Sequence, residues 1–201
     1  SGTTVPASTF SNSTVVSIVD NSCTEATSPI TVSGLGTSIP TSGITIKINI
    51  THTWDGDLKF FLEAPNGELL ALANGNGNSG QNFVNTVFSD AATTNISSGT
   101  APFTGTYKPI GANFTVCGVT TTKTTFGGIG NGSINPNGVW KLRLYDQGAA
   151  DVGTINSWQI DFPSYSTPSP NCGPVTSAAT SVSISNFAAP TISAAGPTTF
   201  C

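Results

Sequence analysis

The stretch that decides the fold runs from Gly138 to Phe162 and reads GVWKLRLYDQGAADVGTINSWQIDF. Large apolar side chains occupy every second position in each half of it: Trp140, Leu142, Leu144, Trp158, Ile160 and Phe162. A period of two predicts strands with one face in a core and the other in water. The acidic, glycine-containing segment Asp146–Gly153 predicts a loop between them. Because two of the three tryptophans of the chain lie here, we expect these strands to supply much of the core.

The chain before this stretch also indicates β-structure. Isoleucine occupies every second position at the start of Ile44–His52, which predicts a strand. Two apolar segments, Leu58–Ala64 and Leu69–Ala73, flank a Pro-Asn-Gly turn and predict a hairpin. The segments Asn74–Asn82 and Thr120–Asn137 are rich in small and polar residues, and they predict loops.

The composition fits an all-β protein and argues against two classes of partner. The 201 residues include 22 Gly and 13 Pro, and no long stretch shows a helical period, so an all-β sandwich is predicted. Only 8% of the residues are charged, and the net charge is −4. No basic cluster favours a nucleic-acid partner, and no apolar run approaches the ~20 residues of a membrane span.

Five motifs occur in an order that points to a family. They are His52–Leu58 (HTWDGDL), Glu63–Gly67 (EAPNG, with alanine in place of the usual serine), Phe88–Ala92, Ala101–Pro109 and the stretch Gly138–Phe162. Taken together, they resemble the P domain (P/Homo B domain) of proprotein convertases and of many secreted bacterial proteins. The resemblance implies a jelly-roll-like sandwich of two antiparallel sheets.

The expected domain organisation follows from this resemblance and from composition. We expect an N-terminal leader over residues 1–14, the P-domain-like sandwich over 15–162 and a Pro/Ser-rich linker over 163–176. Residues 177–201 predict a partial β-element. Their last part, Pro190–Cys201, resembles the opening strand of immunoglobulin-like repeats in bacterial surface proteins. Alternatively, this tail is a strand that adds to a neighbouring sheet edge and allows self-assembly.

The resemblance implies a non-catalytic module of a larger secreted or cell-surface protein, which stabilises or links neighbouring domains. The single histidine, His52, continues the inward phase of its strand, so we expect a core-edge residue and no catalytic residues. Two alternatives stay open. One is an adhesive or carbohydrate-binding module, for which Phe126 is the only aromatic residue on the two long loops. The other is an accessory domain of a subtilisin-like serine protease.

Calcium is the expected cofactor, because P domains that resemble this chain often bind it. The candidate ligands are the aspartates that follow strands or bracket loops: Asp57, Asp90, Asp146 and Asp151. Calcium takes six to eight oxygen ligands, and loops at one end of a sandwich can gather them. The competing interpretation is that these aspartates only cap turns.

The four cysteines favour disulfides and an extracellular location. Cys23, Cys117, Cys172 and Cys201 form no C-x-x-C pair and have no nearby histidine, which argues against zinc. Four cysteines allow three connectivities, and the sequence does not choose among them. Since Cys23 precedes the first family-like strand and Cys117 precedes the last two, Cys23–Cys117 is the pairing we expect.

Overall fold

The structure is a computed structural model that describes residues 3–167. Its elements, in chain order, are β1 (Thr4–Val5), β2 (Ser8–Asn12), β3 (Val16–Ile18), β4 (Ala26–Val32), β5 (Ile39–Pro40), β6 (Thr45–His52), η1 (Asp55–Asp57), β7 (Leu58–Glu63), β8 (Leu69–Asn74), β9 (Phe83–Ser89), β10 (Thr94–Asn95), η2 (Ile96–Ser98), β11 (Thr106–Lys108), β12 (Thr115–Val116), β13 (Val119–Thr120), η3 (Phe126–Gly132), β14 (Ser133–Ile134), β15 (Gly138–Asp146), β16 (Gly153–Phe162) and β17 (Tyr165–Ser166). No helix in this part of the chain is long and apolar enough to cross a membrane. The expected tail element over 177–201 and the cysteines Cys172 and Cys201 lie outside the described residues.

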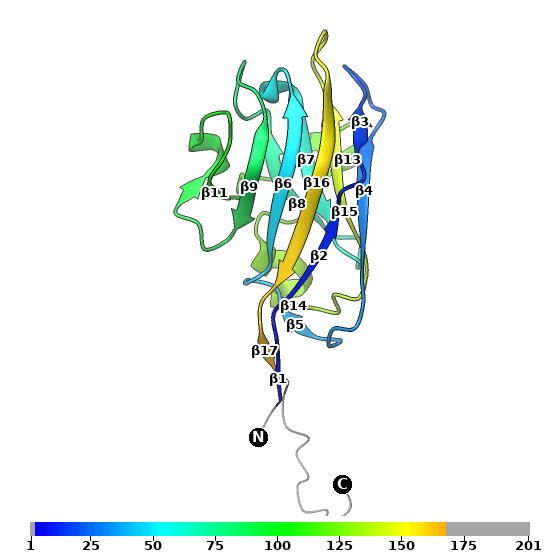
Figure 1. The fold of residues 1–201 in the computed structure, drawn as a ribbon, viewed down its shortest axis with the longest axis vertical. Helices are drawn as coiled ribbons and strands as arrows, with labels where there is room; N and C mark the ends of the chain where they lie inside the picture. Colours follow the sequence, from blue (N-terminus) through cyan, green and yellow to red (C-terminus); the bar gives the residue numbers. More distant parts are fainter. Residues whose placement is uncertain (1–2, 168–201) are drawn as a thin grey trace, which may run out of the picture.

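The larger sheet is built around β6. Its seven strands have the order β10-β11-β9-β6-β16-β2, and β3 also pairs with β16. Along β6, buried residues alternate with more exposed ones, so Ile46, Ile48 and Ile50 point into the core. The strand predicted from the isoleucine repeat is therefore confirmed, and Figure 1 shows β9, β6 and β16 side by side in this sheet.

The smaller sheet has the order β4-β15-β7-β8, and all its pairs are antiparallel. β7 and β8 form the predicted hairpin, whose turn needs the positive φ of Gly67 (+82°). β15 belongs to this sheet, whereas β16 belongs to the larger one, so the stretch Gly138–Phe162 places one strand in each layer. The loop between the two strands therefore crosses one end of the sandwich.

The core lies between the sheets and contains both tryptophans of this stretch. The side chains of Trp140 and Trp158 are 0% and 1% exposed. The indole N–H of Trp140 donates to the Pro136 carbonyl at 2.9 Å, and that of Trp158 donates to Ser28 Oγ at 3.1 Å. The buried rings therefore keep their polar atoms satisfied, and the all-β sandwich is confirmed, while the jelly-roll connectivity stays a prediction.

The sandwich begins earlier than predicted. Residues 8–12, which we expected in an N-terminal leader, form β2 and pair along the edge of β16. β1 pairs with β17, so Tyr165–Ser166 in the expected linker is also part of a small sheet. β2 carries one large apolar residue, Phe10, and every residue from Ser8 to Asn12 keeps some exposure. This segment is a strand because it pairs with the free edge of β16, since its own sequence has no alternation of large apolar and polar residues.

One edge of the larger sheet departs from the antiparallel pairing found in the rest of both sheets. β11 pairs with β9 in parallel, and β10 pairs with β11 in parallel. The irregular segment after β9 carries the chain back along the sheet before β11 begins, so the returning strand runs in the same direction as β9.

A short hairpin covers part of the outer face of the smaller sheet. β12 and β13 are joined through Cys117 and Gly118, which both have positive φ (+49° and +80°). Val116 in β12 packs in a second buried cluster with Phe61 on the sheet. The disulfide Cys23–Cys117 closes this layer with a Cα–Cα distance of 5.4 Å, so the expected pairing is confirmed.

Candidate functional site

Two loops meet at the end of the sandwich where β6 and β15 finish. The segment after β6 carries Asp57, β15 ends at Asp146, and the β15–β16 loop carries Asp151. The backbone N–H of Gln147 donates to the Asp57 carbonyl at 3.0 Å. Thr53 Oγ1 donates to Asp151 Oδ1 at 2.8 Å. The structure therefore brings three of the four aspartates predicted for calcium to one end of the fold.

The fourth predicted ligand, Asp90, lies elsewhere. It follows β9, which runs antiparallel to β6, so it lies at the opposite end from Asp57. Its two carboxylate oxygens accept the backbone N–H groups of Phe126 and Gly127 at 2.9 and 2.8 Å. Asp90 thus caps the start of η3, and its inclusion in a single site with the other three was wrong.

The single histidine is held in a buried pair. The side chains of His52 and Asp146 are fully buried, and His52 Nε2 lies 3.1 Å from Asp146 Oδ2. His52 Nδ1 lies 2.9 Å from the Trp54 carbonyl oxygen and 3.2 Å from the Trp54 backbone nitrogen. Because an ionised carboxylate only accepts hydrogen bonds, Nε2 donates to Asp146 in this pair. Gly153 packs against the ring, since a Cβ there would come within 2.4 Å of His52 Cδ2. Both ring nitrogens therefore have structural partners, and His52 is the core-edge residue that the sequence predicted.

Negative charge is concentrated around Asp57. Burial raises the pKa of the Asp57 carboxyl, and the charges of Asp146 and Asp151 and a side-chain hydrogen bond with Asp151 raise it further. Gly148 lies against this carboxyl so closely that a Cβ there would be 1.9 Å from Asp57 Oδ2. The acid cluster, by which we mean Asp57, Asp146 and Asp151, is thus a place where a cation would relieve repulsion.

The side chains alone do not complete a metal site. Within residues 3–167, no group of three or more His, Cys, Asp or Glu side chains is arranged to hold a metal ion. Asp146 already accepts hydrogen bonds from the Gly148 N–H at 3.0 Å and from His52. A cation at the acid cluster would therefore depend on Asp57 and Asp151, with backbone oxygens or water as further ligands.

Asp55 is the polar residue that the sequence did not single out. It is fully buried in η1, and its Oδ1 accepts the Asn82 backbone N–H at 2.9 Å. Burial raises the pKa of its carboxyl to about 7, although the hydrogen bond from Asn82 and the nearby His52 oppose this shift. Its burial depends on the path of the loop Gly75–Gly80, and the sequence of that loop has no periodic pattern of apolar residues. The only available hint was an acidic Asp-Gly-Asp turn close to a Gly/Asn loop.

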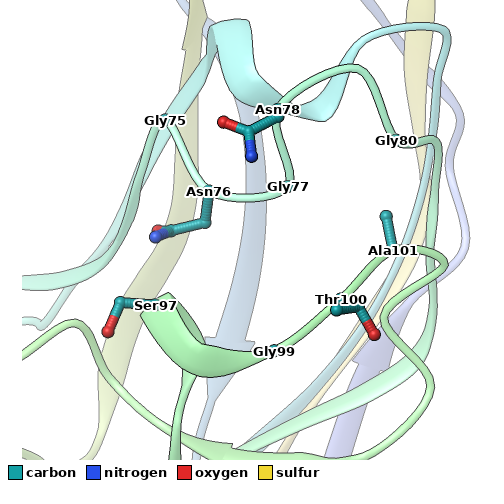
Figure 2. Close-up of a pocket in the computed structure, with 9 residues that line it drawn as sticks. All are labelled: Gly75, Asn76, Gly77, Asn78, Gly80, Ser97, Gly99, Thr100 and Ala101. Atoms are coloured by element: carbon teal, nitrogen blue, oxygen red, sulfur yellow. The ribbon is translucent and has the colours of Figure 1, made fainter.

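A polar groove of about 280 Å³ opens beside that loop. Figure 2 shows the loop Gly75–Gly80 on one side and the segment Ser97–Ala101 on the other. No aromatic or charged side chain lines the groove. Phe126, the aromatic residue that a carbohydrate platform on the long loops would need, is fully buried. The alternative of a carbohydrate-binding module therefore lacks its expected aromatic surface.

Comparisons with known proteins identify the family. The family model described as proprotein convertase P-domain matches residues 41–107 and 120–162. Leupeptin-inactivating enzyme 1 of Streptomyces exfoliatus is 35% identical over 162 residues, which are 80% of this chain and 28% of that protein. Transglutaminase-activating metalloprotease of Streptomyces mobaraensis is 31% identical over 160 residues, 80% of this chain and 16% of that protein. The chain thus spans less than a third of either relative.

Among solved structures, a complex of the Aeromonas sobria serine protease with a chaperone is similar at a TM-score of 0.40 and 11% identity, over 79% of this chain and 26% of that one. The family match includes strands of both sheets, from the segment before β6 to the end of β16, and omits residues 108–119. The chain therefore belongs to the proprotein convertase P-domain family.

Proposed function

We propose that this chain is a non-catalytic accessory domain of a larger secreted protease, where it stabilises the neighbouring domains. The observation that carries the proposal is the family match, which includes strands of both sheets. Two relatives, one named as an enzyme and one as a metalloprotease, are far longer than the matched segment. The buried pair His52–Asp146 adds support, because a histidine with both nitrogens occupied is poorly placed to act as a general base. The disulfide Cys23–Cys117 fits an oxidising, extracellular compartment.

The pairing of β1 with β17 suggests how such a domain is attached. Thr4 pairs with Ser166, and the backbone N–H of Thr167 donates to the Thr3 carbonyl at 2.9 Å. Figure 1 shows β1 and β17 together at one pole of the sandwich, with the acid cluster's loops at the other. Segments before and after the domain would start side by side, which leaves the loop pole free to contact another domain.

The accessory role is tested in the longer protein that contains this chain. The measurement compares the secreted yield and the thermal inactivation of the protease with and without residues 3–167. We expect the shortened protein to be secreted less or to lose activity at a lower temperature, because neighbouring domains lose a packing partner. The isolated chain should not cleave a protein substrate. Hydrolysis by the isolated chain, or unchanged yield and inactivation after deletion, would refute the proposal.

We also propose that calcium stabilises the domain at the acid cluster. The fit rests on Asp57 and Asp151. Burial and the charges of Asp146 and Asp151 raise the pKa of Asp57, so the ionised carboxylates are unfavourable without a neutralising cation. A bound calcium ion would supply positive charge that offsets this repulsion. It would thereby fix the β15–β16 loop against η1.

The calcium proposal predicts a change in melting temperature. Saturating calcium should stabilise the chain by about 1 kcal/mol over a chelator, or roughly 2–4 °C. Asp57→Asn should reduce this gain, while the matched control Asp90→Asn should keep it, because Asp90 lies at the opposite pole. Differential scanning calorimetry with calcium or chelator measures the gain. Equal melting temperatures in both conditions would exclude this role.

A further inference from the structure

Asp55 has one carboxylate oxygen without a hydrogen-bond partner in the described part of the protein. Its Oδ1 accepts the Asn82 N–H at 2.9 Å, but its buried Oδ2 has no partner there. The residue is fully buried, so bulk water does not solvate this oxygen. Leaving a buried polar group unsatisfied costs about 1–3 kcal/mol. A cation bound at Oδ2 would remove this cost.

The surroundings supply further oxygen atoms. The loop Gly75–Gly80 wraps around η1, and its Gly80 carbonyl accepts the Asp55 N–H at 2.8 Å. The Asn78 carbonyl accepts the Gly56 N–H at 2.8 Å. Gly77 lies directly over the aspartate, since a Cβ there would come within 2.9 Å of Asp55 Cβ. Each of these carbonyl oxygens uses one lone pair in the chain and keeps a second for another partner.

The groove in Figure 2 gives this region access to solvent. The loop Gly75–Gly80 that covers Asp55 forms one wall of the groove, and Figure 2 shows the Asn76 and Asn78 side chains on that wall. Asp55 itself does not line the groove, so an ion would have to pass between the residues of this loop to reach the carboxylate. A large ligand would not reach it, because Gly77 separates Asp55 from the groove.

Asp55 is separate from the acid cluster, although Asp57 is only two residues away. Asp55 packs under Gly77 and bonds to Asn82, whereas Asp57 packs against Gly148 and interacts with Asp151. The two carboxylates thus lie against different loops, one before β9 and one after β15. An ion bound at one of them is not shared with the other.

We propose that Asp55 Oδ2 and carbonyl oxygens of the loop Gly75–Gly80 bind one calcium ion, at a second site independent of the acid cluster. One carboxylate surrounded by neutral oxygens is a ligand set that calcium accepts, because it tolerates irregular oxygen coordination. Magnesium is a poorer candidate, since it demands near-ideal octahedral geometry. With only one negative charge, the affinity should be weak, with a Kd of about 0.1–1 mM, in the range of extracellular calcium modules.

A calcium titration of the full 201-residue chain, followed by two-dimensional amide NMR, tests the proposal residue by residue. The amide signals of Gly77, Gly80 and Asn82 should shift together and saturate with one Kd. In Asp55→Asn, which keeps the size of the side chain, this affinity should fall at least about tenfold, because the ion loses its only charged ligand. Magnesium should move the same signals much less.

Two further arms separate this site from the acid cluster. Asp57→Asn should leave the calcium response of Gly77 and Gly80 unchanged, so the two calcium proposals can fail independently. Asp161→Asn serves as a matched control far from both sites and should bind as the unmodified chain does. The proposal is overturned if the loop amides stay still up to about 10 mM calcium. It is also overturned if Asp55→Asn responds normally, or if only signals near Gly148 move.

Discussion

At the scale of single residues, Glu25 is the centre of an ion-pair network on the outer face of the smaller sheet. It accepts hydrogen bonds from Arg143 Nε at 2.8 Å and Nη2 at 2.5 Å, from the Tyr145 hydroxyl at 2.6 Å, and from Thr27. Burial alone would raise the pKa of Glu25, but these hydrogen bonds and the charge of Arg143 outweigh it, so the pKa lies below its ordinary value of 4.5. The ionised form of Glu25 therefore stabilises the fold.

Replacing this glutamate should change stability in a pH-dependent way. Because the folded pKa is below the unfolded one, the stabilisation is present above about pH 4.5 and is lost as the pH falls through the folded value. Glu25→Gln should thus cost about 1–2 kcal/mol at pH 7, and the gap to the unmodified chain should close in strong acid. Urea unfolding of both proteins across this pH range measures the gap. A gap that stays constant with pH would contradict the role of the charge.

From the sequence, it was easier to predict which aspartates near strand ends lie together than to predict which acidic residue is buried. Asp57, Asp146 and Asp151 were expected together because they flank strong strands, and they meet at one pole. Asp90 also follows a strand, but strand direction decides which pole it reaches, and one sequence does not fix that direction. Asp55 could not be identified as a site residue from the sequence, because its burial depends on how a loop without a periodic pattern closes over it.

At the scale of elements, the alternation of apolar and polar residues predicted the strands whose own side chains build the core. It missed the strands that form only because they pair with the edge of another strand. β6, β7, β15 and β16 have buried positions at regular spacing or in apolar runs, and all four were expected. β2 and β11 have mainly half-buried or exposed positions. They are strands because β16 and β9 offer free edges, which is a tertiary effect that no local pattern records.

The covering hairpin β12–β13 is the element that depends most on a covalent bond. It is held through Cys117 to Cys23, across a sequence separation of 94 residues, and it covers the cluster around Phe61. Replacing both cysteines by alanine should lower the free energy of unfolding by about 2–4 kcal/mol. Amide hydrogen exchange should also speed up at Val119 and Thr120, because the hairpin loses its anchor. The exchange rates of the β7 amides serve as the internal reference. Unchanged exchange at Val119 and Thr120 would show that packing alone holds the hairpin.

At the scale of the whole molecule, the two poles of the sandwich differ in the elements and residues that they gather. One pole gathers β1 and β17, the first and last strands of the described segment, through the pairs Thr4–Ser166 and Val5–Tyr165. The other gathers the loops that carry Asp55, the acid cluster and the half-exposed Trp54 (44% exposed). A domain attached at one pole and polar at the other can lie beside its neighbours, instead of standing between them as a linear spacer.

This arrangement predicts that the two ends of the segment 3–167 can be joined without loss of the fold. Paired residues of antiparallel strands have Cα atoms about 4.5–5.5 Å apart, so a linker of about four glycines should connect Thr167 to Thr3. A circular permutant of residues 3–167 opened between Asn66 and Gly67, in the exposed β7–β8 turn, should unfold in one transition within about 1–2 kcal/mol of the unpermuted segment. Denaturant unfolding measures this difference. A second permutant with a linker twice as long is the control for strain. If the longer linker restored stability that the short one lost, the ends would not meet as β1 and β17 place them, and attachment through a single pole would have to be abandoned.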